Sequence, residues 1–271
     1  MANLTRRALQ AMKNACYDTS LTDAQWSLVE PLMPAAARLG RPRTPLRVVF
    51  DSILYVAKSG CPWRLLPANF PPWKTVYHHF HRWCLDGTMD LLNQALRAVA
   101  RNIADKRSRP TAAIIDSQTV RSDPHGGEVA YDAAKKTKGR KRFLCVDTLG
   151  LVLDVVLLPA NTPEREGAKV LLEPVLKQHA WLRKIWADGG FSGPEFAHWV
   201  KERRPKAVVE VVRRCDQTSG FHVLPRRWVI ERTFGWLCQH RRLVRDYEKT
   251  TRSARAWILV AMTRIMLRRL A

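Results

Sequence analysis

Three segments decide the fold class of this 271-residue chain: AAIIDSQTV at 112–120, RFLCVDTLGLVLDVVLL at 142–158 and KIWADGG at 184–190. Each holds a short run of aliphatic or aromatic residues bounded by polar residues, which is the pattern of a buried β-strand. Leu149-Gly150 separates two such runs and predicts a β-hairpin of 143–147 and 151–158. AVVEVV at 207–212 predicts the fifth strand.

Helical patterns separate and follow these strands. Apolar residues recur at helical spacing over 163–178 and 193–203, and two further helices are expected over 225–247 and 253–270. The order strand, hairpin, helix, strand, helix, strand, helix, helix predicts an α/β fold in which a mixed sheet is flanked by helices.

The first hundred residues have a purely helical pattern. Residues 1–20 are polar and weakly patterned, and we expect a flexible lead-in there. Thr22 and Gln25 have the spacing of a capping box and begin the first of four expected helices, at about 23–33, 45–59, 74–86 and 88–104. The fourth is expected to turn one apolar stripe inward, made of Leu91, Leu92, Leu96, Val99 and Ile103. Arg109-Pro110 ends this pattern, which predicts an all-α domain over 21–108 and an α/β domain over 109–271.

The outward residues of the all-α part are basic or polar. Short helices with basic loops are similar to a helix-turn-helix-like DNA-binding bundle. The candidate DNA contacts in this part are Arg41, Arg43, Lys74, Thr75, His78 and Arg82. A helical bundle without DNA contacts is the alternative, because such bundles are common.

The charge of the chain points to a polyanionic partner. The 46 Lys and Arg residues outnumber 24 Asp and Glu, a formal net charge of +22, and the excess lies mainly in residues 1–110 and 226–271. Nucleic acid is the leading candidate, and a ribosomal-type binding protein is the alternative on charge alone. The six Cys residues form no C-x-x-C pair and no signal peptide or long apolar run is present, so we expect a cytoplasmic protein that does not enter a membrane.

Three carboxylates are candidates for chemistry. The first strand is expected over 112–116 and the fourth over 184–188, so Asp116 and Asp188 each end a strand, where open α/β sheets place their ligand sites. Glu231 lies in an apolar part of the expected helix 225–247, and a cation would stabilise it there. Oxygen ligands favour Mg²⁺ or Mn²⁺, and two such ions support phosphodiester chemistry. The alternatives are that strand-end Asp residues form turns, and that Arg227, four residues before Glu231, pairs with it.

A basic tract enters the predicted hairpin. KKTKGRKR at 135–142 contributes Lys138, Arg140 and Lys141, which are candidates for contacts with DNA phosphates. The alternative is a solvated face at the edge of a strand.

Six blocks of this sequence resemble DDE-class insertion-sequence transposases of the insertion sequence five group. They are LTDAQWSLVEPLMP (21–34), CPWRLLPANFPPWKTVYHHFHRW (61–83), IDSQTV (115–120), VLLPANTPE (156–164), WADGGFSG (186–193) and WVIERTFGWLCQHRRLVRDYE (228–248). The resemblance implies an RNase H-like catalytic domain with Asp116, Asp188 and Glu231 as catalytic and metal-binding acids. It also implies that Arg227 contacts DNA. Cys238 and Leu224 stand where the family has a basic residue and a Tyr, and Arg241 or Arg242 are candidates to replace the basic residue.

The resemblance further implies what the protein acts on. It would bind terminal inverted repeats, cleave DNA with two Mg²⁺ or Mn²⁺ ions, and join the 3′-OH to target DNA as a homodimer or larger assembly at the bacterial nucleoid. An inactive DNA-binding regulator of the same fold, or a nuclease without strand transfer, are the alternatives.

Overall fold

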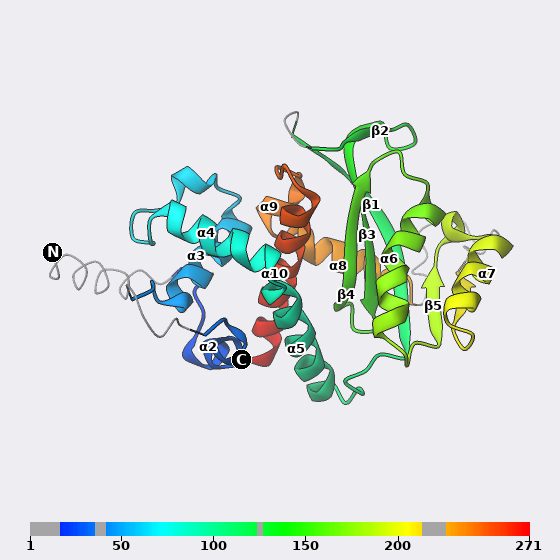
Figure 1. The fold of residues 1–271 in the computed structure, drawn as a ribbon, viewed down its shortest axis with the longest axis horizontal. Coiled ribbons are helices and arrows are strands. Elements are labelled where there is room, and N and C mark those ends of the chain that lie inside the picture. Colours follow the sequence, from blue (N-terminus) through cyan, green and yellow to red (C-terminus); the bar gives the residue numbers. More distant parts are fainter. Residues whose placement is uncertain (1–16, 36–41, 124–126, 213–225) are drawn as a thin grey trace, which may run out of the picture.

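The computed structural model describes residues 17–35, 42–123, 127–212 and 226–271. Its two main parts are a mixed β-sheet and a cluster of helices, which lie on opposite sides of the C-terminal helix α10, Thr251–Leu270 (Figure 1). No helix in the described ranges combines the length and the apolar character needed to cross a membrane.

The sheet confirms the α/β class. Its strands are β1 (Ala112–Arg121), β2 (Ala130–Asp132), β3 (Thr137–Asp147), β4 (Val152–Pro159), β5 (Lys184–Ala187) and β6 (Val208–Val211). β3 pairs antiparallel with β1, β2 and β4, whereas β1 with β5 and β5 with β6 are parallel. The predicted hairpin is therefore β3 and β4, and β1 lies at the centre of the sheet.

Both faces of the sheet are covered by helices. Successive residues of a strand point to opposite faces. Ala113 and Ile115 of β1 pack in the core with α6 (Glu164–Gln178) and α7 (Pro194–Arg203), and Ile114 packs in the core that includes α8 (Trp228–Cys238) and α10. The central strand is thus buried on both sides.

The N-terminal helices are close to their predicted ranges. They are α2 (Asp23–Val29), α3 (Leu46–Ser59), α4 (Trp73–Leu85) and α5 (Thr88–Ile103), with short 3₁₀ turns η1 (Glu30–Leu32) and η2 (Trp63–Leu65). The Thr22 and Gln25 capping box is present, and Gly60 ends α3 in the left-handed conformation. Trp257 of α10 stacks on Phe80 of α4, so the N-terminal and C-terminal helices share one core. The domain division at 108/109 stays a prediction.

The predicted buried stripe of α5 was partly wrong. Leu92 and Leu96 are buried, but Leu91, Val99 and Ile103 are exposed. The helix instead buries Asn93, Arg97 and Arg101, which are at most 5% exposed. The Arg101 guanidinium pairs with the buried Asp147 carboxylate of β3, and Arg97 donates to the Val152 carbonyl of β4. These two contacts with the sheet rotate the apolar residues outward.

Three other boundaries differ from prediction. β1 continues five residues beyond Asp116, because residues 117–121 pair with residues 139–143 of β3. The helix expected over 225–247 is broken, since His240 is extended between α8 and α9 (Arg241–Val244). Residues 17–20 of the expected lead-in are packed: the Tyr17 ring stacks on Phe70, and Thr19 is buried. Residues 1–16 lie outside the described residues.

Candidate functional site

Two aspartates lie close together where the parallel pairing of β1 with β5 ends. Ile114 of β1 lies opposite Trp186 of β5. The pairing ends there; two residues further on lie Asp116, still within β1, and Asp188, which directly follows β5. The negative charge of Asp188 acts on the pKa of Asp116, so the two carboxylates are close to each other. Alternation directs both carboxylates toward the face that packs on α8, as it does Ile114 and Trp186. Asp116 lies within β1 rather than at its end, which corrects the expected strand end, while Asp188 directly follows β5.

Each carboxylate is held by a backbone amide of its own segment. The Ser117 N–H donates to Asp116 Oδ1 at 2.7 Å. The Gly190 N–H donates to Asp188 Oδ1 at 2.9 Å, which makes Asp188 the N-cap of the 3₁₀ turn η3, Gly189–Phe191. One oxygen of each side chain is therefore oriented, and the other is left for a ligand.

Asp116 is a buried carboxylate with two other acids nearby, Asp188 and Glu164. Its pKa is raised to about 7, first by burial and then by the negative charges of Asp188 and Glu164. The hydrogen bond from the Ser117 amide and the Arg227 guanidinium act in the opposite direction. A bound cation would offset both the burial and the repulsion.

The third predicted acid, Glu231, is not part of this pair. It lies in the first turn of α8, its side chain is half exposed, and its Oε1 accepts from Arg227 Nη2 at 3.0 Å. This is the i, i+4 ion pair that the sequence left open as the alternative. Because Arg227 also acts on the pKa of Asp116, the guanidinium connects the two acids. Within the described residues, no three His, Cys, Asp or Glu side chains are grouped closely enough to hold a metal ion.

Glu164, the first residue of α6, is an acid that the sequence reasoning missed. Its Oε1 accepts from Lys141 Nζ at 3.1 Å, while its Oε2 is buried without a hydrogen-bond partner. It approaches the Asp188 loop, since its Cγ lies 3.2 Å from where a Cβ on Gly190 would stand. The available signal was that Glu164 ends the block VLLPANTPE.

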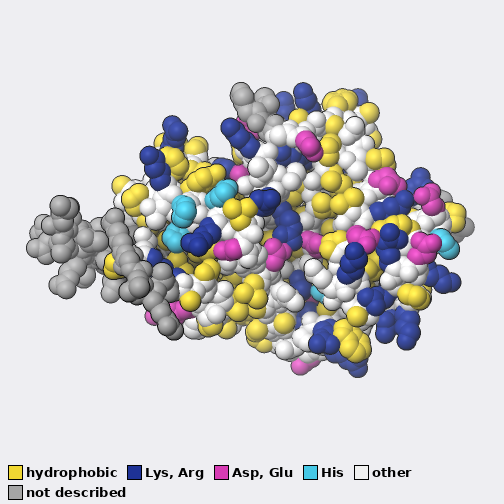
Figure 2. Space-filling view, viewed as in Figure 1, with side chains coloured by type: hydrophobic (Ala, Val, Ile, Leu, Met, Phe, Trp, Pro, Cys, Tyr) yellow, Lys and Arg dark blue, Asp and Glu magenta, His cyan; other side chains and the backbone are white. Residues whose placement is uncertain are grey.

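The predicted DNA contacts separate into exposed and buried residues. Arg43 and three residues of α4 are exposed, and Figure 2 shows histidines beside Lys or Arg on this part of the surface. Thr75 is half-buried, and Arg41 lies outside the described residues. The exposed α4 residues are Lys74, His78 and Arg82. Arg241 is also exposed, whereas Arg242 pairs with Glu248.

The basic tract at 135–142 is only partly exposed, so Arg140 and Lys141 are corrected as candidate phosphate contacts. Lys138 is exposed, but Arg140 is 1% exposed and pairs with the equally buried Asp246 at 2.8 Å. Lys141 is buried against Glu164. Residues 246–249 cover Arg140. The exposed cations of the tract are Lys135, Lys136 and Lys138.

Comparison with known proteins agrees with this architecture. The family model of the transposase DDE domain matches residues 107–266, and that of putative transposases of the IS4/5 family matches residues 21–93. The chain is 29% identical over 172 residues to a putative transposase for insertion sequence element IS402 of Burkholderia cepacia, covering 58% of this chain and 78% of that one. It is 32% identical over 120 residues to the uncharacterized protein y4sN of Sinorhizobium fredii, covering 44% and 86%. No solved structure gives a significant match.

Proposed function

The chain belongs to the transposase DDE-domain family, and from this premise we propose that it cuts DNA at the ends of a mobile element and joins the freed 3′-OH to target DNA. Membership of the family makes the chain a transposase with an RNase H-like fold that acts on DNA. The cleavage and joining steps, and the residues that perform them, are the proposal.

Asp116 and Asp188 are the proposed centre of the site. Their donor set fits a divalent cation, because both groups are carboxylates, they are adjacent, and burial together with mutual repulsion raises the pKa of Asp116. Mg²⁺ and Mn²⁺ prefer such oxygen ligands. Two ions held there would activate the attacking oxygen and stabilise the leaving oxygen. The closeness of Asp116 and Asp188, each two residues beyond the paired Ile114 and Trp186, is the observation that carries this proposal.

Glu231 is proposed to join the two aspartates when DNA is bound. Its ion pair with Arg227 is half exposed, so it is weak and exchanges readily for other partners. A DNA phosphate near the start of α8 would compete for the Arg227 guanidinium. Release of Glu231 would then leave its carboxylate free to turn toward the site, while Arg227 holds the phosphate.

The remaining proposed contacts position the DNA. Phosphate contacts of this kind give affinity and register rather than sequence specificity. The proposed residues with exposed side chains are Arg43, Lys74, His78, Arg82, Lys138 and Arg241. Bringing two element ends together requires two copies of the chain or more, and we propose a dimer or larger assembly acting on chromosomal DNA in the bacterial cytoplasm.

Cleavage of a plasmid carrying the element ends tests the proposal. Asp116→Asn and Asp188→Asn remove a charge while preserving shape, and loss of several kcal/mol of metal-mediated stabilisation predicts a fall in rate of about 100-fold or more. Asp105→Asn is the matched control, because Asp105 is exposed and its φ of 51° suits Asn. Retained cleavage in both site variants, with normal DNA binding, would overturn the assignment.

An inactive DNA-binding regulator is the second candidate. The observation that favours it is that Glu231 pairs with Arg227 and that no three-acid cluster exists among the described residues. Divalent-dependent nicking of an element end separates a regulator from an enzyme. A pre-cut end incubated with target DNA then separates a nuclease from a transposase, because only the latter joins the two.

A further inference from the structure

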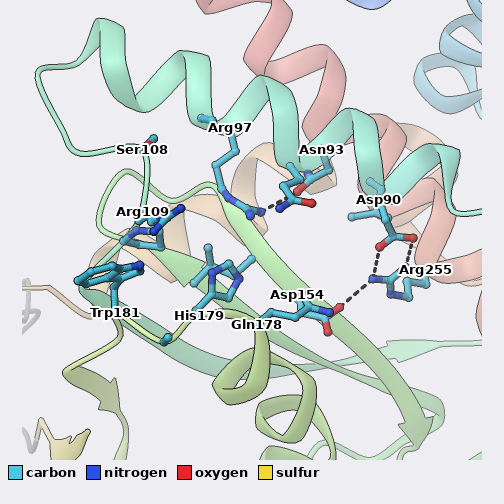
Figure 3. A pocket seen from close by; sticks show the side chains of 16 residues that line it. Asp90, Asn93, Arg97, Ser108, Arg109, Asp154, Gln178, His179, Trp181 and Arg255 are labelled. Atoms are coloured by element: carbon cyan, nitrogen blue, oxygen red, sulfur yellow. Dashed lines mark hydrogen bonds and ion pairs between the residues drawn. The ribbon is translucent and has the colours of Figure 1, made fainter. Parts of the chain in front are cut away.

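A cavity of about 770 Å³ lies at the edge of the sheet, between α5, β4 and the loop after α6 (Figure 3). Pro110 lines it, and Asp116 is six residues further along β1, about 20 Å at the rise of a strand. The cavity is therefore separate from the aspartate pair. Its size falls within the roughly 300–1,000 Å³ typical of pockets for small ligands.

One wall of the cavity carries a buried cation without a counter-ion. Arg97 of α5 is 5% exposed, and its Nη1 donates to the Asn93 Oδ1 at 3.0 Å and to the Val152 carbonyl at 2.6 Å. In the described part of the chain, no carboxylate lies within ion-pair distance of this guanidinium. Asn93 is 3% exposed, and its Nδ2 has no hydrogen-bond partner. A buried charge without a carboxylate in ion-pair contact and a buried amide nitrogen without an acceptor are both costly, and an anion would satisfy both.

The neighbouring carboxylates act on Arg97 only at longer range: the charges of Asp147 and Asp154 favour its protonated form, but each binds another guanidinium directly. Asp90 and Asp154 also line the cavity, but both carboxylates bind the Arg255 guanidinium, at 2.6 and 2.9 Å. Burial and then the charge of Arg97 lower the pKa of His179 to about 4, so its imidazole is neutral at pH 7. Arg97 and Asn93 thus keep N–H donors available to a ligand, beside the neutral imidazole of His179.

The opposite wall offers an aromatic face. Trp181, in the loop after α6, is 50% exposed, and the Arg109 guanidinium lies 5.5 Å from its ring centroid. Figure 3 shows His179 between this pair and Arg97. An aromatic ring beside a cation is the usual platform for a nucleic-acid base. The cavity therefore combines an anion-binding end with a base-stacking end.

We propose that this cavity binds one nucleotide, with its phosphate on Arg97 and Asn93 and its base on Trp181. The nucleotide has two sources: an unpaired nucleotide of DNA or a free mononucleotide. The DNA source rests on the proposed function, whereas the chemistry of the cavity does not.

Titration calorimetry with deoxyadenosine monophosphate tests the proposal. The wild-type protein should bind it saturably, and Trp181→Ala should weaken binding about 10-fold or more, since stacking contributes roughly 1–3 kcal/mol per base. Trp181→Phe should stay within about 3-fold because a stacking face is kept. Trp199→Ala is the matched control: the Trp199 ring packs on Arg203 at 4.0 Å on α7, outside the cavity, and its loss should leave binding unchanged.

Asn93→Asp probes the phosphate end. It supplies Arg97 with a carboxylate, so the variant should fold with an unchanged or raised melting temperature and bind deoxyadenosine monophosphate at least about 10-fold more weakly. Deoxyadenosine, which lacks the phosphate, should bind this variant and the wild type equally.

Competition between sources completes the test. A short single-stranded oligonucleotide that displaces labelled mononucleotide at about 10-fold lower concentration identifies DNA as the source, and equal potency identifies the free nucleotide. Absence of saturable binding by either probe, or affinities unaffected by both Trp181→Ala and Asn93→Asp, would refute the site. Asp188→Asn, which tests the proposed function, should bind the mononucleotide normally, so the two proposals fail separately.

Discussion

Replacing Arg140 with Met should strongly lower the free energy of unfolding of the protein. Its effect on DNA binding should be much smaller. The Arg140 side chain is 1% exposed, and its Nη1 binds Asp246 Oδ2 at 2.8 Å. The same guanidinium donates to three backbone carbonyls, those of Glu128, Glu248 and Lys249. Arg140→Met keeps the aliphatic volume but leaves the Asp246 carboxylate buried and unpaired. Breaking a buried pair in this way costs about 3–5 kcal/mol, a large part of the roughly 5–15 kcal/mol that stabilises a typical protein.

Urea denaturation measures this loss. With an m-value of about 3 kcal/mol/M, the midpoint should fall by roughly 1–1.7 M. Lys138→Met, an exposed change two residues away on β3, is the matched control and should shift stability by less than about 0.5 kcal/mol while weakening DNA binding. The double variant Arg140→Met with Asp246→Leu should recover most of the loss. An Arg140→Met protein with a wild-type midpoint but poor DNA binding would refute the reasoning.

Two further predictions concern stability. Burial raises the pKa of Asp51 to about 6, so the folded state binds its proton more tightly than the unfolded chain, and this contribution is lost as pH rises from about 4 to 6. The variant Asp51→Asn still accepts a hydrogen bond from the Leu21 amide. It should raise the free energy of unfolding by up to about 3 kcal/mol at pH 8 and by about 1 kcal/mol at pH 4.5. Equal gains in the free energy of unfolding at the two pH values would contradict this prediction. Gly167→Ala would place its Cβ 2.0 Å from the Phe143 ring and should destabilise by roughly 1–3 kcal/mol, whereas Gly235→Ala, with open space, should be neutral or stabilising. Thermal melts that show equal effects of the two glycine variants would refute the packing argument.

Local patterns predicted most of the secondary structure. The hairpin of β3 and β4, the capping box at Thr22 and the helices α6 and α7 all follow from spacing within about 20 residues. Asp116 and Asp188 were identified because each follows an apolar run, and the parallel pairing of β1 with β5 then brought them together.

The errors came from partners distant in sequence. Arg101 of α5 pairs with the carboxylate of Asp147, which is 46 residues away in the sequence, and Arg140 pairs with that of Asp246, which is 106 residues away. An analysis of periodicity treats every basic residue as solvent-exposed. It therefore predicted the wrong buried face for α5 and an exposed side chain for Arg140. Glu164 was missed for the same reason, since its place near Asp188 depends on how α6 packs on the sheet.

The central claim is that Asp188, together with Asp116, holds the divalent ion used to cut DNA. The most direct measurement is cleavage of an element-end plasmid by Asp188→Cys, compared in Mg²⁺ and in Mn²⁺. A thiolate is a poor ligand for Mg²⁺ and a better one for Mn²⁺, as expected from their relative softness. If the claim holds, the variant is inactive in Mg²⁺ and regains cleavage in Mn²⁺, while wild type cuts in both. Cleavage by the variant at the wild-type rate in Mg²⁺ would contradict it.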